Sequence, residues 1–348
     1  MDSITQAALG ATVAGAMAGK RCNGKVLLAG ALLGTLPDLD VFIDYGDDIS
    51  NTVKHRGFSH SLLILLPFSL LLAGLIQRVK PVANWSFSRL WLLIAACLIT
   101  HPLLDNFTSY GTQLLWPIAG YFSLSSVFII DPLYTLPLLI AIGFGLARKS
   151  ALSRYCAIAL CVSSMYLGWS LAAKAYIEQR AAASLDTLGI NADAVFITPT
   201  PFNTLLWRIV VLDGERYWEG LASVLDAEQE VEFIAQRRGS WPLPVEPEHL
   251  QALKTFTHGF VRFDQQDKQL VVADLRLGMF GNLAFKFVFA EQDSAGQWQP
   301  IVPTRLAQGE LKGDFSKLKD RALGDQQINA SLDLCPSPCG LNASQLND

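Results

Sequence analysis

The chain has 348 residues, of which 51% are hydrophobic and 17% are charged. Soluble domains carry about 25% charged residues, so this composition excludes a wholly soluble protein. The formal net charge of −4 at pH 7 gives no support for nucleic-acid binding, and no nucleic-acid partner is expected. The apolar stretch at the N-terminus has no basic residue before it, which distinguishes it from a signal peptide.

Six apolar segments follow one another in the first half of the chain. They cover residues 4–19, 26–36, 61–79, 90–105, 127–147 and 155–173. The first two are short for a membrane span, which usually needs about 20 residues, but their small residues suit close packing of helices. The pattern predicts an α-helical membrane bundle of about six helices, two of them short, over residues 1–175.

Basic residues sort the connections between these segments. Residues 20–25, 78–89 and 148–154 each carry a cluster of Lys and Arg, whereas residues 37–60 and 105–126 carry no cluster of that size. Lys and Arg mark the cytoplasmic side of a membrane protein. We therefore predict a multi-pass protein of the bacterial inner membrane, with the lipid bilayer as its partner. Its N-terminus, the other two loops and everything after about residue 175 are predicted on the periplasmic side.

The second half of the chain has the composition of a soluble β-rich α+β domain, predicted over residues 176–331. Strands are predicted at residues 194–198, 205–211, 216–224, 230–236, 260–263, 270–277 and 283–289, and a helix at 246–257. Asp213-Gly214 is a hairpin signal between two of these strands. Residues 332–348 are predicted to be a flexible tail, in which Cys335 and Cys339 would form a disulfide loop in an oxidising compartment.

Three short motifs of imidazole and carboxylate residues lie at the ends of apolar segments. The candidate metal ligands in them are Asp38, Asp40, His55, His60, His101 and Asp105. Taken singly, each motif is more often structural, as an Asp in a turn or a buried His–Asp hydrogen bond. The predicted topology places all three at the outer end of the bundle. Ionisable groups at membrane depth are costly and usually functional, and this set of ligands suits a divalent metal, with zinc as the first choice.

Other polar residues are predicted at the same end of the bundle. Asp2 and Gln6 share one face of the first segment and are candidates for hydrogen bonds to the metal ligands. Asp131 could serve as a ligand, a general base or a helix cap, and the sequence leaves these roles open. Arg56 is interpreted as an anchor for a phosphate or a carboxylate. His-Glu-x-x-His, Gly-x-Ser-x-Gly and Walker motifs are absent from the sequence.

Four ordered motifs resemble the YdjM-like inner-membrane metal-dependent hydrolases over about residues 1–150. They are Met-Asp-Ser-Ile-Thr-Gln at 1–6, Leu-Pro-Asp-Leu-Asp at 36–40, His-Arg-Gly-Phe-Ser-His-Ser at 55–61 and His-Pro-Leu-Leu-Asp at 101–105. That family is distantly similar to zinc-dependent phospholipases C and single-strand zinc nucleases. The resemblance implies metal ligands at the six residues named above. This chain departs from the family at Gln6, where many members carry His.

These observations together predict an integral membrane hydrolase that uses a divalent metal. Its substrates would be phosphoesters or lipid-linked compounds at the outer face of the inner membrane. The metal would lower the pKa of a bound water to about 7. The base would be Asp131 or a carboxylate of the set that does not bind the metal, and Arg56 would neutralise charge on a phosphate. The alternatives are a non-enzymatic, metal-stabilised envelope protein and a metal transporter, whose ligands should lie near the bilayer midplane. The substrate, the number of metal ions and the oligomeric state stay open.

Overall fold

The computed structural model describes residues 1–79, 85–148, 151–279, 282–307 and 315–332. The chain forms two units. The first comprises Met1–Asp44, Val53–Ser170 and Pro201–Asn203, and the second comprises Tyr45–Thr52, Leu171–Thr200 and Thr204–Asp348. The predicted tail from residue 333 onward, with Cys335 and Cys339, lies outside the described residues. Cys22, Cys97, Cys156 and Cys161 are free thiols.

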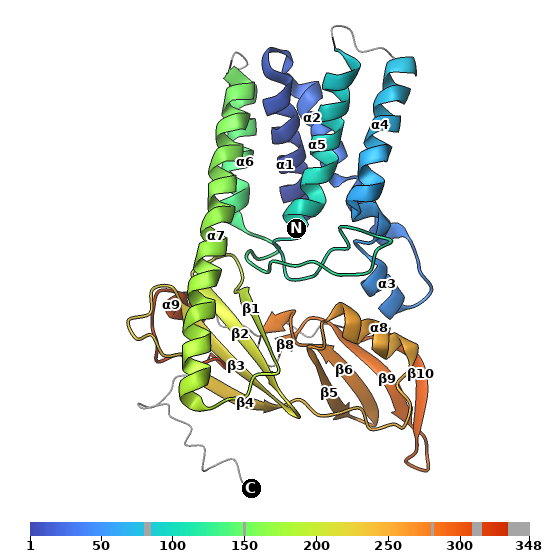
Figure 1. Ribbon diagram of the computed structural model, residues 1–348, viewed down its shortest axis with the longest axis vertical. Coiled ribbons are helices and arrows are strands. Elements are labelled where there is room, and N and C mark those ends of the chain that lie inside the picture. Colours follow the sequence, from blue (N-terminus) through green and yellow to red (C-terminus); the bar gives the residue numbers. More distant parts are fainter. Residues whose placement is uncertain (80–84, 149–150, 280–281, 308–314, 333–348) are drawn as a thin grey trace. The chain divides into compact units, whose positions relative to one another are not determined.

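Helices form in each of the six apolar segments and run side by side in the first unit (Figure 1). They are α1 Ser3–Ala18, α2 Gly24–Thr35, α4 Leu62–Val79, α5 Phe87–Asp105, α6 Pro132–Ala147 and α7 Leu152–Leu188. Short elements join them: the 3₁₀ helices η1 Gly19–Arg21, η2 Pro37–Phe42 and η3 Phe58–His60, and the helix α3 Asp48–Lys54. Asp2 caps α1, and Asp131 caps α6 with Pro132 as its first residue.

The lengths of these helices support the predicted bundle only in a coarser form. Among the described residues, three helices are long and apolar enough to cross a membrane, namely α4, α5 and α7. The helices α2 and α6, with 12 and 16 residues, are shorter apolar helices. The helix α7 is longer than the sixth apolar segment, because it continues without a break to Leu188. The fifth begins only at Pro132, because Asp131 caps the helix there.

Glycines allow the backbones of α1 and α2 to touch. A Cβ placed on Gly10 would lie 2.2 Å from the carbonyl oxygen of Gly30, and one on Gly34 would lie 2.6 Å from that of Gln6. Any larger side chain at these positions would force the helices apart. The close approach matters beyond the helix pair, because it fixes where the carbonyl group of Gly34 points.

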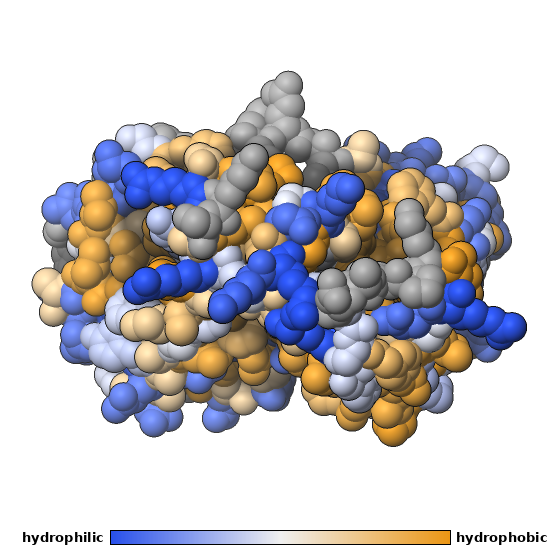
Figure 2. Space-filling view, turned by 90° about the horizontal axis from the view of Figure 1, so that it is seen from above, coloured by the Kyte–Doolittle hydropathy of each residue, from blue (hydrophilic) through white to orange (hydrophobic). Residues whose placement is uncertain are grey.

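One end of the first unit is rich in basic residues. Figure 2 looks onto the end where α1 joins α2, α4 approaches α5 and α6 approaches α7, and hydrophilic residues gather over its centre between apolar flanks. Among the residues that the structure describes, the exposed basic residues at these connections are Lys20, Arg21, Lys25, Arg78, Arg148 and Arg154. Trp85 lies between two guanidinium groups, with Arg21 6.0 Å and Arg89 5.5 Å from its ring centroid. This end carries the charge pattern on which the predicted topology depends.

The second unit contains two four-stranded antiparallel sheets. The first has the order β1-β2-β3-β4, from β1 Ala194–Pro199, β2 Leu206–Asp213, β3 Arg216–Ser223 and β4 Phe233–Arg237. The second has the order β10-β9-β6-β5, from β10 Trp298–Arg305, β9 Lys286–Gln292, β6 Gln269–Asp274 and β5 Val261–Gln266. A small ribbon of β7 Gly278–Met279 and β8 Asn282–Leu283 and the helices α8 Glu248–Phe256 and α9 Phe315–Ala322 complete the unit.

The strand β2 is buried on both faces, since successive side chains point to opposite sides of a sheet. Trp207, Ile209 and Val211 belong to a cluster with Ile177 and Leu185 of α7. The intervening Val210 and Leu212 pack with residues of the second sheet. The β-rich second half is therefore confirmed. The prediction missed β10, whose two prolines are unusual in a strand, and the short helix α9.

Candidate metal centre

Three elements of the first unit bring most of the candidate ligands together. The 3₁₀ helix η2 carries Asp38 and Asp40, η3 ends at His60, and the last turn of α5 carries His101 and Asp105. A 3₁₀ helix has about three residues per turn, so residues three apart share a face. Pro37 and Asp40 are accordingly the buried residues of η2. Since His101 and Asp105 are four apart on α5, both point into the same space.

Two histidines and two carboxylates surround one buried point. The Nε2 atoms of His60 and His101 lie 3.0 Å apart. Asp38 Oδ1 lies 3.4 Å from the first and 3.3 Å from the second, and Asp105 Oδ2 lies 3.3 Å and 3.5 Å from them. The side chains of His60, His101 and Asp105 are 0% exposed, whereas that of Asp38 is 20% exposed. The group therefore opens to solvent on the side of Asp38.

Hydrogen bonds at the other ring nitrogens fix how both histidines point. His101 Nδ1 donates to the carbonyl oxygen of Gly34 at 2.5 Å. Ser59 Oγ donates to Asp40 Oδ2 at 2.7 Å, so it accepts from His60 Nδ1 at 2.9 Å. These bonds direct both Nε2 atoms toward the same buried point, where a proton or a cation can lie between them.

The separations fit a metal ion. Ligand atoms held tetrahedrally at about 2.0–2.2 Å from an ion lie roughly 3.3–3.6 Å apart, close to the imidazole–carboxylate distances of this group. Gln6 Oε1 and Asp105 Oδ2 are buried acceptors that receive no hydrogen bond from any residue the structure describes. Buried polar atoms without a hydrogen bond are costly, and a cation at the centre would give Asp105 Oδ2, which faces both Nε2 atoms, a further partner.

Asp38 also belongs to a second group with Asp40 and His55. His55 Nδ1 lies 2.9 Å from Asp40 Oδ1, and the backbone N–H of Arg56 donates to Asp40 Oδ2 at 2.9 Å. The side chain of His55 is 23% exposed. The arrangement therefore offers two adjoining places for a cation, with the carboxylate of Asp38 shared between them.

The carboxyl groups of η2 are held in their charged form. Burial tends to raise the pKa of Asp38, but its contacts with His101 and His60 outweigh burial and keep that pKa below its usual range. Burial likewise opposes ionisation of Asp40, and contacts with His55 and Ser59 lower its pKa. Both groups are anions at neutral pH, which is the form in which a carboxylate binds a metal.

Arg56 lies next to the candidate ligand Asp105. It is buried, and its Nε lies 3.3 Å from Asp105 Oδ2. One terminal nitrogen donates to Thr108 Oγ1 at 3.2 Å, and the guanidinium carbon lies 5.1 Å from the ring centroid of Tyr110. The guanidinium group therefore lies against a carboxylate of the centre itself, and the role of Arg56 in binding an anionic substrate stays a prediction.

Gln6 and Asp2 occupy different environments. Gln6 Nε2 donates to Asp105 Oδ1 at 3.0 Å and to the carbonyl oxygen of His101 at 3.2 Å, so it lies against the ligands. The amino group of Met1 contacts the same oxygen of Asp105. Asp2 instead accepts hydrogen bonds from the backbone of Ile4 and Thr5 as the cap of α1.

The side chain of Asp131 caps the start of α6. Its carboxylate accepts from the backbone N–H groups of Leu133 and Tyr134 and from the hydroxyl of Tyr166 at 2.8 Å. Burial raises its pKa, and these hydrogen bonds only partly offset the effect. Neither metal-ligand group formed by described residues includes Asp131. Its contacts are those of a helix cap, one of the three roles that the sequence left open.

The sequence reasoning missed two groups that orient the histidines, Ser59 and the carbonyl of Gly34. Ser59 directly precedes His60, and that adjacency was the available signal. Replacing Ser59 with alanine should weaken metal binding by about 10–100-fold, the usual effect of losing a hydrogen bond behind a ligand. Competition with a chelator measures the affinity. Ser88→Ala, on the exposed first turn of α5, is the control and should leave the metal affinity unchanged. Equal metal affinities of the two variants would contradict the role of Ser59 in orienting His60.

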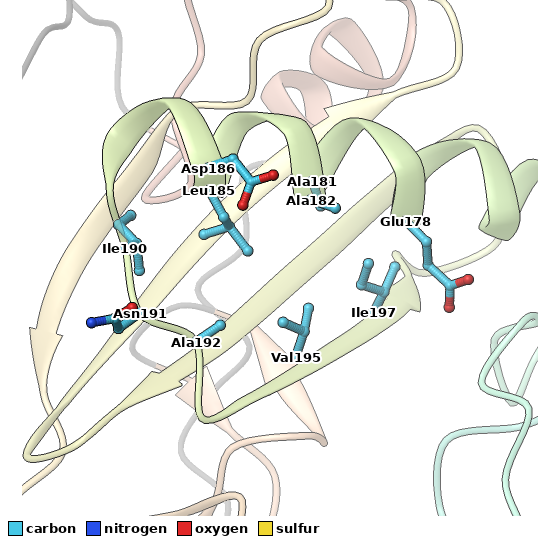
Figure 3. Close-up of a pocket in the computed structure, with 10 residues that line it drawn as sticks. All are labelled: Glu178, Ala181, Ala182, Leu185, Asp186, Ile190, Asn191, Ala192, Val195 and Ile197. Carbon is cyan, nitrogen blue, oxygen red and sulfur yellow. The ribbon is translucent and has the colours of Figure 1, made fainter.

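A pocket in the second unit has different chemistry. It has a volume of about 510 Å³ and lies between the end of α7 and β1 (Figure 3). Ala181, Leu185 and Ile197 form an apolar floor, and the carboxylates of Glu178 and Asp186 lie at its edge. Its lining contains neither histidine nor cysteine. Among the residues that the structure describes, the groups of side chains that could hold a metal ion are the two that share Asp38.

Comparisons with known proteins agree with the motif pattern. The family model described as YdjM inner membrane protein matches residues 1–177 of the 348 residues. The uncharacterized protein YfhP of Bacillus subtilis is 24% identical over 197 residues, 56% of this chain and 58% of that protein. The inner membrane protein YbcI of Escherichia coli is 33% identical over 117 residues, 33% of this chain and 66% of that protein. The alignments thus span less than two thirds of either relative. No solved structure matches the chain.

Proposed function

Because the chain belongs to the YdjM inner membrane protein family, we propose that it acts in a bacterial inner membrane as a metal-dependent hydrolase. The observation that carries the proposal is the buried approach of His60 Nε2 and His101 Nε2 to 3.0 Å. With the carboxylates of Asp38 and Asp105 on either side, these atoms form a ligand set of the kind that zinc prefers.

Asp38, His60, His101 and Asp105 would hold one ion, and His55 and Asp40 would complete a second place that shares Asp38. A bound divalent ion supplies Lewis-acid chemistry, polarising a phosphoryl or carbonyl oxygen. Gln6 and Arg56 hold Asp105 in place, and Ser59 orients His60. The partial exposure of Asp38 and His55 leaves a route for a polar group to the ions. The role of Asp131 as general base stays a prediction.

A non-enzymatic, metal-stabilised envelope protein is the second candidate. The complete burial of His60, His101 and Asp105 favours it, because structural metal sites are closed and catalytic sites keep an open position. The two functions agree on metal binding and differ in turnover. We also propose, from the basic connections, that the metal centre faces the periplasm. A reporter fused at residue 348 that reads as cytoplasmic would contradict that orientation.

The direct test uses the full-length protein purified in detergent. Metal content is measured, and hydrolysis of bis(p-nitrophenyl) phosphate and of phospholipid vesicles is followed before and after chelation. Chelation should lower the melting temperature by several degrees, because a ligand present at about 100 times its Kd stabilises by about 2.7 kcal/mol. Loss of hydrolysis on chelation and its return with zinc support the enzyme. Bound metal without hydrolysis of either compound supports the structural candidate, and a protein that binds no divalent metal contradicts both.

A further inference from the structure

An exposed apolar edge lies directly beside the metal centre. Of the residues that follow Asp38, Leu39 is 52% exposed, Val41 66%, Phe42 83% and Ile43 41%. The intervening Asp40 is buried against His55 and Ser59. The exposed side chains of residues 39–43 are therefore all apolar, whereas both acidic residues of η2 take part in the metal-ligand groups.

The geometry of η2 explains this division. Because residues three apart share a face of a 3₁₀ helix, Leu39 and Phe42 project together on a different face from the buried Pro37 and Asp40. Asp38 and Val41 share the third face, on which the Asp38 side chain is 20% exposed and Val41 is 66% exposed. A molecule lying along Leu39 and Phe42 would therefore have its next contact at Asp38, the open side of the metal centre.

The apolar edge continues an apolar helix. After Leu36, η2 follows directly on α2, whose Leu28 and Leu32 are also exposed and lie one turn apart. In a protein of an inner-membrane family, an outward row of leucines on an apolar helix faces lipid. A Phe exposed to this extent at the end of η2, which follows that helix, is costly in water but favourable among acyl chains.

We propose that Leu39, Val41, Phe42 and Ile43 form a lipid-binding edge at the bilayer interface. This edge holds the acyl chain of an amphiphile while its anionic head group reaches Asp38 and His55 through the ions they hold. The assignment of the head group rests on the proposed metal-dependent function, whereas the lipid contact of the edge does not. The substrate class that follows is a membrane phosphoester with at least one acyl chain.

Photo-crosslinking in native membranes tests the lipid contact without any need for activity. Phe42→p-benzoylphenylalanine in the full-length chain should give a lipid adduct, detected by mass spectrometry. The same probe at Leu71, an outward residue of α4 with 72% exposure, is the positive control, and at Val302, exposed to 65% on β10, it is the negative control. No lipid adduct at 42 beside one at 71, a protein adduct at 42, or equal lipid yields at 42 and 302 would each overturn the inference.

The acyl-chain role is tested by a ratio of rates. For Phe42→Ser, the rate on bilayer phospholipid relative to that on soluble bis(p-nitrophenyl) phosphate should fall about tenfold, because the contact between the aromatic ring and the acyl chain is lost. Val302→Ser should leave the ratio unchanged. An unchanged ratio in Phe42→Ser overturns the acyl-chain role even if the crosslink is found. Hydrolysis that fails on both compounds while position 42 still crosslinks to lipid would instead reject the hydrolase and retain the lipid edge.

Discussion

Replacing His101 with alanine is expected to abolish hydrolysis and to lower metal affinity by more than about 100-fold, the upper end of what loss of a supporting hydrogen bond costs. The change removes one of two nitrogen donors from a fully buried group and leaves the carboxylates of Asp38 and Asp105 without it. Metal content after dialysis and the rate on bis(p-nitrophenyl) phosphate are the measurements. His258→Asn in the second unit, where Asn tolerates the positive φ of 52°, is the control.

His55→Ala then distinguishes one ion from two. His55 belongs only to the group of Asp38 and Asp40, so its loss should remove one ion and leave the other if two are bound. With a single ion between His60 and His101, His55→Ala should keep the full metal content. Wild-type metal content and wild-type rate in His101→Ala would contradict the proposed centre altogether.

The main features of the candidate site were predictable because they are local. The ligand types stand in short motifs, and each motif lies at one end of an apolar segment. Helix caps are also local signals, and Asp2 and Asp131 begin α1 and α6 as side chains of that type do. The assembly of the motifs then follows from the alternating direction of the helices.

Contacts between distant elements could not be predicted in this way. The carbonyl of Gly34 orients His101 only because α2 lies close to α5, and no spacing in the sequence reports that distance. Similarly, no spacing in the sequence reports that Arg56 Nε lies 3.3 Å from Asp105 Oδ2.

The end of α7 was missed for a different reason. Hydropathy falls after Ala173, where Lys174 and Glu178 appear, so the apolar segment ends there. Helical periodicity nevertheless continues, since Ile177, Ala181 and Leu185 recur every four residues and pack against the first sheet. Apolar content and helical periodicity measure different things, and only the second follows the helix into the second unit.

The second large effect is expected from Gly34→Ala, because this glycine links helix packing to the metal centre. The added methyl group would lie 2.6 Å from the carbonyl oxygen of Gln6 and 2.9 Å from Gly10 Cα, so backbone atoms must move. Overpacking of this kind costs about 1–3 kcal/mol, and it also displaces the carbonyl that accepts from His101 Nδ1. We therefore expect a lower melting temperature together with metal affinity reduced by about 10–100-fold.

Two glycine controls separate these effects. Gly74→Ala in α4 adds a methyl group with nothing within 4 Å and should raise stability by about 0.5–1 kcal/mol. Gly15→Ala meets Cys156 Sγ at 2.6 Å and Leu27 Cδ2 at 2.8 Å, so it should lower the melting temperature. Since Gly15 accepts no hydrogen bond from His101, its variant should keep the metal affinity of the unaltered chain. If Gly34→Ala were as stable as Gly74→Ala, the close contact of α1 and α2 would be wrong. If Gly34→Ala and Gly15→Ala lost stability equally and both kept full metal affinity, the carbonyl of Gly34 would not position His101.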